Sequence, residues 1–159
     1  MEVMIEFIRH YFSKELTVFL TAMLPFVELR GSVPLGISLG LNPYNVLLIS
    51  IIGNIIPIFP LLLILNPVRE YLIKHFKIME RFFDWLYKRT LKKSDKVEKY
   101  GAIGLILFTA IPFPTTGAWT ASIAAVIFKI KFKSALLAII TGVIFAGIVV
   151  TFTSHLIFT

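Results

Sequence analysis

The stretch Pro25-Phe26-Val27-Glu28-Leu29-Arg30-Gly31-Ser32-Val33-Pro34 places a carboxylate and a guanidinium inside a run, residues 16–41, that is otherwise uncharged. A single charged side chain at the centre of a bilayer costs roughly 2.5–3.5 kcal/mol, so Glu28 and Arg30 must be paired or face water. Two prolines and a glycine within this stretch also interrupt a regular helix. The stretch therefore predicts two short helices joined by a polar turn, which is shielded by protein or lines a water-filled cavity.

The composition is typical of an integral membrane protein. Of 159 residues 57 % are hydrophobic, the mean hydropathy is +0.87, and uncharged runs cover residues 16–27, 31–68 and 101–128. The formal charge of +7 arises mainly between these runs, where attachment to the membrane surface explains it better than nucleic-acid binding. The absence of cysteine excludes disulfides and thiolate metal sites. Glu2 and Glu6 stand where a cleavable signal peptide carries lysines, so we expect none.

The chain reads as one membrane domain, residues 1–159, in four segments. Residues 1–14 carry apolar side chains at helical spacing, which predicts an amphipathic helix in the membrane interface. Residues 15–66 form a first repeat, with two half-length arms followed by a run of twenty uncharged residues that can span. Residues 67–99 form a basic amphipathic connector with ten Lys/Arg against five Asp/Glu, and residues 100–159 form a second repeat.

The two repeats align at their proline-rich turns. Residues 24–31, from Leu24-Pro25-Phe26 to Gly31, match residues 111–117, from Ile111-Pro112-Phe113 to Gly117, with one residue deleted. Gly53 in the first span matches Gly142 in the second. A re-entrant hairpin plus one span crosses the membrane once, so the second repeat runs upside down, as in the inverted repeats of many secondary transporters. The residues expected in the two hairpin turns are Pro25, Gly31, Pro34, Pro112 and Pro114.

The distribution of positive charge favours this arrangement. With re-entrant hairpins, residues 69–99 and 129–133 share one face and contribute thirteen Lys/Arg, against Arg9 and Lys14 on the other. Four full crossings would instead give twelve against three. By the positive-inside rule we expect a multi-pass protein of the cell membrane, with the connector in the cytoplasm and both termini outside it.

Two motifs carry a family resemblance, Phe26-Val27-Glu28-Leu29-Arg30-Gly31-Ser32-Val33-Pro34 and Pro112-Phe113-Pro114-Thr115-Thr116-Gly117-Ala118-Trp119. They resemble motifs of the small multidrug export proteins, a branch of the wider DedA superfamily, and the resemblance covers the chain from about Leu16 onward. It implies two re-entrant hairpins that face each other from opposite sides of the membrane, each followed by a tilted span. In related members it also implies movement of lipids or polyprenyl phosphates. Thr115 departs from the glycine expected after Pro114, and threonine resists positive φ.

The first motif supplies the two charged candidates. Arg30 offers five donors in a fixed fork, which suits bidentate binding of a phosphate or carboxylate. The alternative is a structural ion pair between Arg30 and Glu28. Glu28 could hold a proton for coupling, or it could lock the turn as the partner of Arg30.

The second motif and the first span supply further candidates, each with a structural alternative. Thr115, Thr116 and the backbone N–H groups near Gly117 could accept an anion at a helix start, or the hydroxyls could merely cap that helix. Trp119 could stack on a ligand or pack against the opposite hairpin. Asn54, in the middle of the first span, could line the cavity or bond to a backbone carbonyl.

Other chemistry is not indicated. The three histidines are scattered and suggest no metal site. The sequence has no phosphate-binding glycine loop, nucleophile elbow or carboxylate cluster. We therefore expect no metal, no cofactor and no enzymatic activity.

The hypothesis is a transporter or flippase-like protein that moves an amphiphile with an anionic headgroup, a phospholipid or a polyprenyl phosphate. In it, Arg30 holds the headgroup at the membrane midplane, the turn at 115–117 approaches from the opposite side, and Glu28 sets the charge balance or carries a proton. One alternative is a proton-coupled exporter of small cationic drugs that bind to Glu28. Another is a non-transporting scaffold. Membrane lipids are the expected partners, nucleic acid is not, and the small enclosed volume is compatible with a homodimer.

Overall fold

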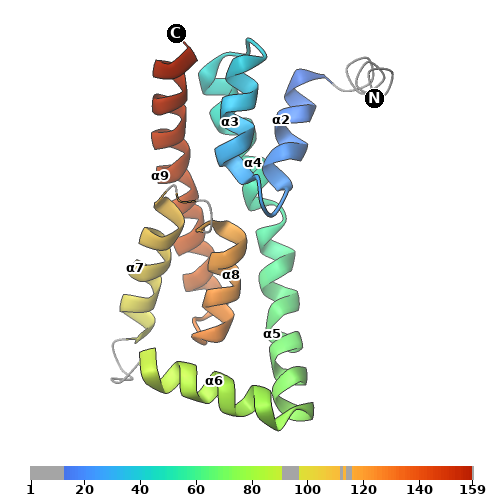
Figure 1. Ribbon diagram of the computed structural model, residues 1–159, viewed down its shortest axis with the longest axis vertical. Helices are drawn as coiled ribbons and strands as arrows, with labels where there is room; N and C mark the ends of the chain where they lie inside the picture. The colour runs from blue at the N-terminus through green and yellow to red at the C-terminus, as the bar shows by residue number, and fades with distance from the viewer. Residues whose placement is uncertain (1–12, 91–96, 112, 114–115, 159) are drawn as a thin grey trace. The chain divides into compact units, whose positions relative to one another are not determined.

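The computed structural model describes most of the chain, namely residues 13–90, 97–111, 113 and 116–158. Every regular element in these ranges is a helix, as predicted (Figure 1). Two stretches, Pro43–His75 and Phe132–Phe158, are long and apolar enough to cross a membrane. The interfacial helix predicted for residues 1–14 lies, except at its end, outside the described residues.

The chain divides into two compact units. The first consists of Met1–Pro57 and Val143–Thr159, and the second of Ile58–Gly142. The predicted single membrane domain, with a repeat boundary after residue 66, stays a prediction.

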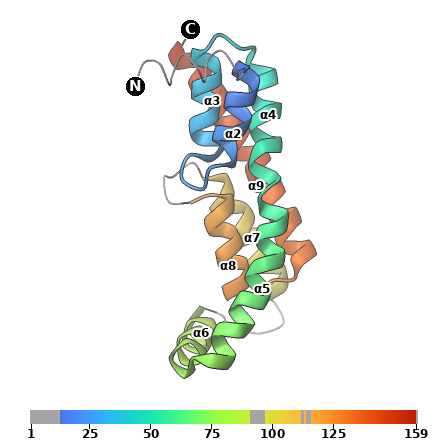
Figure 2. The same ribbon diagram turned by 90° about the vertical axis from the view of Figure 1, so that its right-hand side faces the viewer.

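The first unit is built on a short helical hairpin and the start of a long apolar stretch. Its helices before the last are α2 (Lys14–Met23), α3 (Glu28–Ser38) and α4 (Pro43–Ile55). All three pack against one another, and both views show α2 and α3 side by side along α4 (Figure 1, Figure 2). The helix α4 is capped at its start, because the Asn42 side chain accepts from the Tyr44 N–H at 2.9 Å and Pro43 takes the first helical position.

The first hairpin turn is shorter than predicted. It occupies residues 24–27, and α3 continues through Gly31 and Pro34, which were both expected in the turn. Gly31 instead serves close packing, because a Cβ there would overlap the Val27 side chain one turn earlier. Pro34 lies inside the helix, where its missing N–H removes a single bond to the carbonyl four residues before.

The second unit contains a longer set of helices: α5 (Ile58–His75), α6 (Lys77–Thr90), α7 (Val97–Ala110), α8 (Ala118–Ile127) and α9 (Phe132–Phe158) up to Gly142. The ring of Phe59 on α5 meets that of Phe132 edge to face at 5.5 Å. The predicted connector begins within α5 and continues as α6, and the Arg69 guanidinium lies 5.7 Å from the centre of the Phe83 ring. Exposed Ile78, Phe82 and Trp85 add an apolar face to α6.

The long helix of each unit meets the first hairpin arm at a glycine. In the first unit, a Cβ on Gly53 would lie 2.7 Å from the Phe19 carbonyl oxygen and 3.0 Å from the Ala22 Cβ. In the second, a Cβ on Gly142 would lie 2.9 Å and 2.5 Å from the corresponding atoms. The equivalent residues are Phe19 and Ile106, Ala22 and Thr109, and Gly53 and Gly142. The two glycines that the sequence alignment matched therefore make the same close helix contact in both units.

The second hairpin arm of each unit also ends in the same way. Gly40 after α3 has φ 79° and Lys129 after α8 has φ 54°. In both, the next N–H bonds back to a helix carbonyl, that of Gly36 at 3.1 Å and that of Ala125 at 2.9 Å. A left-handed residue with this bond is a Schellman cap, which satisfies the last carbonyls of a helix. The orientation of the repeats in a membrane, and with it the inverted repeat, stays a prediction.

Replacing Gly53 or Gly142 by alanine should lower stability, because the added Cβ displaces a backbone carbonyl of the adjacent arm. Overpacking of this kind costs about 1–3 kcal/mol. Gly104→Ala is the matched control, since nothing lies within 4 Å of a Cβ at this helical position, and it should gain about 1 kcal/mol of helix propensity. Thermal unfolding of the purified protein in detergent compares the three variants. Equal losses in all three would contradict the packing role.

Candidate functional site

Glu28 combines burial with a strained backbone. It opens α3 with φ 51°, its side chain is 6 % exposed, and its N–H donates to the Leu24 carbonyl at 3.0 Å. A residue with a Cβ in the left-handed region costs about 1–2 kcal/mol relative to the right-handed helix. Burying a carboxylate costs more unless it is paired. Strain of this kind clusters at binding and catalytic sites, so Glu28 marks a candidate site.

Arg30 stands beside this carboxylate in a less enclosed position. It interacts electrostatically with Glu28 and is half-buried. Residues two apart in a helix do not face each other, so the two side chains leave α3 in different directions. The turn before them exposes Phe26 by 95 %. The interior of the unit therefore contains the carboxylate, and the guanidinium lies at its edge.

The face of α3 that buries Glu28 meets α4 at successive levels. At the first level, a Cβ on Gly36 would lie 2.7 Å from the Val46 side chain. One turn along, the Ser32 hydroxyl donates to the Ser50 hydroxyl at 2.8 Å, and both are fully buried. These contacts show that α3 and α4 run antiparallel in this register.

Helical spacing assigns Glu28, one turn before Ser32, and Asn54, one turn after Ser50, to the next level of this register. Asn54 is 1 % exposed, and neither its Oδ1 nor its Nδ2 has a hydrogen-bond partner among the described residues. We call Glu28, Ser32, Ser50 and Asn54 the polar seam. The structure thus places Asn54 inside the first unit, and the expected bond to a backbone carbonyl is absent.

The second unit has the same buried positions without the polar groups. Its first arm follows that of the first unit by 87 positions (Ala22 to Thr109), and its second arm and long helix follow by 89 (Gly36 to Ala125, Gly53 to Gly142). This register pairs Gly117 with Glu28, and not with Gly31 as in the sequence alignment. The counterparts of the seam are Gly117, Ala121 and Ile139 in the second unit and Val143, with which the first unit resumes, all buried. Packing of a hairpin on a long helix therefore does not require the seam.

The second hairpin turn uses its hydroxyl groups locally. The Thr116 hydroxyl donates to the carbonyls of Ile111 at 2.7 Å and Phe113 at 3.2 Å, so it closes the turn. The cap of α8 is Gly117, whose N–H donates to the Thr120 hydroxyl at 2.9 Å. Capping of α8 by the hydroxyls of Thr115 and Thr116 stays a prediction.

The remaining predicted residues of this turn are less defined. Thr115 lies outside the described residues, as do Pro112 and Pro114. Trp119 is half-buried in the first turn of α8. Of the predicted site, the first unit holds Glu28, Arg30 and Asn54, whereas Thr116, Gly117 and Trp119 belong to the second unit.

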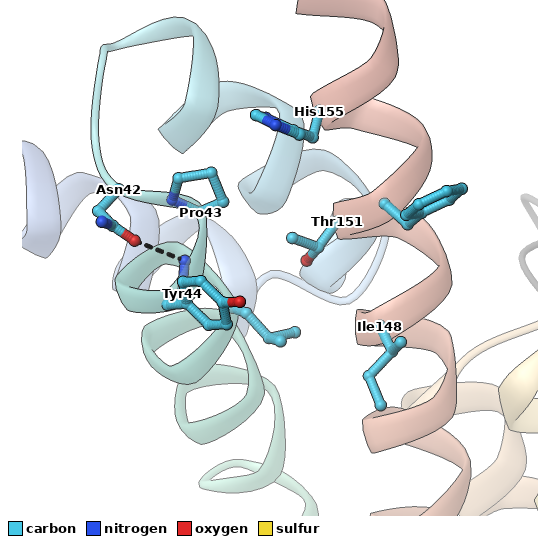
Figure 3. A pocket seen from close by; sticks show the side chains of 8 residues that line it. Asn42, Pro43, Tyr44, Ile148, Thr151 and His155 are labelled. Atoms are coloured by element: carbon cyan, nitrogen blue, oxygen red, sulfur yellow. Dashed lines mark hydrogen bonds between the residues drawn. The ribbon is translucent and has the colours of Figure 1, made fainter.

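A separate pocket of about 510 Å³ lies in the first unit, where α4 begins and α9 nears its end (Figure 3). The side chains of Thr151 and His155 on α9 point toward Pro43 and Tyr44 on α4. Tyr44 and Asn54 are ten residues apart, or about 15 Å along a helix, so the pocket is distinct from the deep end of the seam. Its lining is Asn42, Pro43, Tyr44, Leu47, Ile148, Thr151, Phe152 and His155.

A protein-family model with the description "Putative small multi-drug export protein" matches residues 28–149. The chain belongs to this family. The match includes the whole polar seam and the second hairpin turn, and it begins directly after the first turn. Searches of curated proteins and of solved structures find no match. Family membership and the two long apolar helices indicate a membrane protein.

Two residues of the seam in this family member were missed by the sequence analysis. Ser32 and Ser50 are small hydroxyl residues, which are common in apolar helices and attract little notice. The usable signal was spacing, because Ser32 follows Glu28 by four residues and Ser50 precedes Asn54 by four, so each pair shares a helix face. The pocket had no such signal, because its lining comes from two stretches that are far apart in the sequence, residues 42–47 and 148–155.

Backbone strain at Glu28 can be separated from its charge by two substitutions. Both Glu28→Gln and Glu28→Gly remove the carboxylate, but only glycine relieves the left-handed conformation, which is worth about 1–2 kcal/mol. We expect Glu28→Gly to unfold at the higher temperature. Lys129→Gly is the control at an exposed site with φ 54°, and it should also stabilise the protein. A less stable Glu28→Gly beside a stabilised Lys129→Gly would contradict strain at Glu28.

Proposed function

We propose that the protein is an ion-coupled membrane exporter of small cationic compounds and that Glu28 is the group that binds them. The observation that carries this proposal is Glu28, whose carboxylate is buried and whose backbone is strained. It lies in the polar seam, and the second unit has no polar groups at the equivalent positions. Neutral oxygens of Ser32, Ser50 and Asn54 surround the same interface, so the interior attracts positive charge. The family description agrees with export of small compounds. No enzymatic step is part of the proposal.

The lengths of the helices support a site near the middle of the membrane. The arms α2 and α3 have ten and eleven residues, or about 15 Å each, which is half of a hydrocarbon core of about 30 Å. Asn54 follows the start of α4 at Pro43 by eleven residues and therefore lies at a similar depth. We propose that both hairpins are re-entrant and inverted, with the basic connector in the cytoplasm and the termini outside. Two copies in a homodimer would enclose a larger path.

A second candidate is the flippase-like transport of an anionic amphiphile, as the DedA superfamily would imply. It is favoured by Arg30, a half-buried guanidinium beside a turn that exposes Phe26 by 95 % and Leu24 by 50 %. A phosphate headgroup suits the guanidinium fork, and a lipid tail suits the apolar turn. In this candidate Arg30 binds the substrate, and Glu28 adjusts its charge or carries a proton.

Charge substitutions separate the two candidates in proteoliposomes. For a cation exporter, Glu28→Gln should reduce efflux of a cationic dye by about tenfold or more, equal to 1.4 kcal/mol of lost interaction. For a flippase, Arg30→Gln should remove movement of a labelled anionic lipid, and Arg30→Lys should keep part of it. Arg69→Gln, which changes an arginine in the connector, is the control.

The paired variant Glu28→Gln with Arg30→Gln tests the scaffold alternative. Removing one partner of a buried pair can cost about 3–5 kcal/mol, whereas the double variant leaves no orphan charge. We expect a folded protein, checked by thermal unfolding, without transport of either probe. Full transport by the double variant would assign the charges a purely structural role.

Membrane topology is tested with single cysteines, since the chain has none of its own. Ser38 and Lys131 are suitable because both are exposed, at the ends of the two hairpins. An impermeant maleimide should label Ser38→Cys in intact cells and Lys131→Cys only after permeabilisation. Labelling of both from the same side would mean that each hairpin crosses the membrane, and the re-entrant arrangement would be wrong.

A further inference from the structure

The Asn54 side chain is buried without a partner at a position where packing needs no amide. Its two polar atoms have no hydrogen bond among the described residues, and its exposure is 1 %. An unsatisfied buried amide destabilises a folded protein, and an apolar side chain of similar shape avoids that cost. The counterpart in the repeat register is Val143, which is equally buried. Retaining an amide at this position therefore indicates a ligand that bonds to it.

The atoms that face the same interface define the chemistry of this ligand. By their register they are the Glu28 carboxylate, which also interacts with Arg30, the Asn54 Oδ1 and the hydroxyls of Ser32 and Ser50, and all of them are hard oxygen donors. Hard cations prefer such oxygens. Among the described residues no three His, Cys, Asp or Glu side chains come together, so a transition metal lacks its usual ligands. One carboxylate with neutral oxygens matches a monovalent cation.

The tightness of the interface limits the size of the cation. One level above the serines, a Cβ on Gly36 would already lie 2.7 Å from Val46, so α3 and α4 are in close contact. While α3 and α4 are packed together, an inorganic ion fits this interface better than an organic ammonium, which reaches Glu28 only after the two helices separate. A proton alone would neutralise Glu28 and leave the Asn54 amide without a partner.

We propose that the polar seam binds one sodium ion between α3 and α4, coordinated by Glu28, Asn54 and the hydroxyls of Ser32 and Ser50. Sodium, in place of the proton expected from the sequence, is then the coupling ion. A cationic substrate and the sodium ion share the Glu28 carboxylate and exclude each other, which is the requirement for exchange. The proposal of sodium binding is supported by the residues of the seam alone. The role of sodium as coupling ion rests on the proposed export function.

The test is thermal unfolding of the purified full-length protein at fixed pH and ionic strength in sodium, potassium or choline chloride. A ligand that binds the folded state raises the unfolding temperature as its concentration rises. We expect sodium to raise it above the value in choline, and potassium to do so less. Asn54→Val, which installs the residue found at the counterpart position, should lose the sodium response and unfold at a higher temperature in choline. Ser122→Ala, a buried serine of the second unit that bonds within its own helix at 2.7 Å, should keep the full response.

Three results would overturn the sodium site. They are equal unfolding temperatures in all three salts, an unchanged sodium response in Asn54→Val, and loss of the response in Ser122→Ala as well. A response to pH that Glu28→Gln removes, without any response to sodium, would likewise assign the seam to a proton. Sodium stabilisation without efflux of a cationic dye supports the site and removes the export function alone. Efflux that persists in choline medium leaves export in place and contradicts sodium coupling.

Discussion

The close approach of a half-length hairpin arm to a long apolar helix is the constraint on which the structure depends. At Gly53 and Gly142 the absence of a side chain lets the long helix lie on a backbone carbonyl of the adjacent arm. Arms of about ten residues are too short to form stable isolated helices, so their order comes from this packing. The helix α3 also packs closely on α4, at Gly36. The side chains between these two helices are therefore buried from both solvent and lipid.

This constraint makes the polar seam informative. A buried hydroxyl pair and a buried carboxylate in a tight helix contact lower stability unless their bonds are satisfied. In the repeat register, Gly117, Ala121 and Ile139 of the second unit occupy the places of Glu28, Ser32 and Ser50, which shows that an apolar solution exists in this fold. The difference between the units therefore reflects a role other than folding. At these levels the interface is polar in the first unit and apolar in the second.

The sequence predicted the elements better than their register. Hairpin arms of about ten residues, the long apolar stretches and the glycine contact at Gly142 followed from hydrophobic run lengths and small residues. Gly31 and Pro34 were misplaced, because local propensity marks both as turn residues whereas packing against Val27 and the neighbouring helices keeps them in α3. The pairing of Gly117 with Gly31 failed because the second turn is longer, and turn length cannot be read from apolar flanks.

The candidate site was also predicted only in part from the sequence. Glu28, Arg30 and Asn54 stand out because polar side chains are costly in an apolar run. Ser32 and Ser50 do not, since a serine can satisfy its hydroxyl on its own helix, as Ser122 does through the Ala118 carbonyl. What distinguishes the first two is a partner on another helix, which only the tertiary structure shows. The left-handed backbone of Glu28 is likewise invisible in the sequence, because glutamate has no preference for it.

The strain at Glu28 and the unpaired amide of Asn54 have a common consequence for the proposed binding of a cation. Both raise the free energy of the ligand-free seam, and a bound cation that pairs with the carboxylate and the amide offsets part of that cost. A seam that was fully satisfied without ligand would gain less from binding, and one that was fully open would hold an ion too weakly. The proposed exporter has to bind and release its ion in each cycle, and an interior that is held together by packing, with the Asn54 amide unsatisfied among the described residues, suits that task.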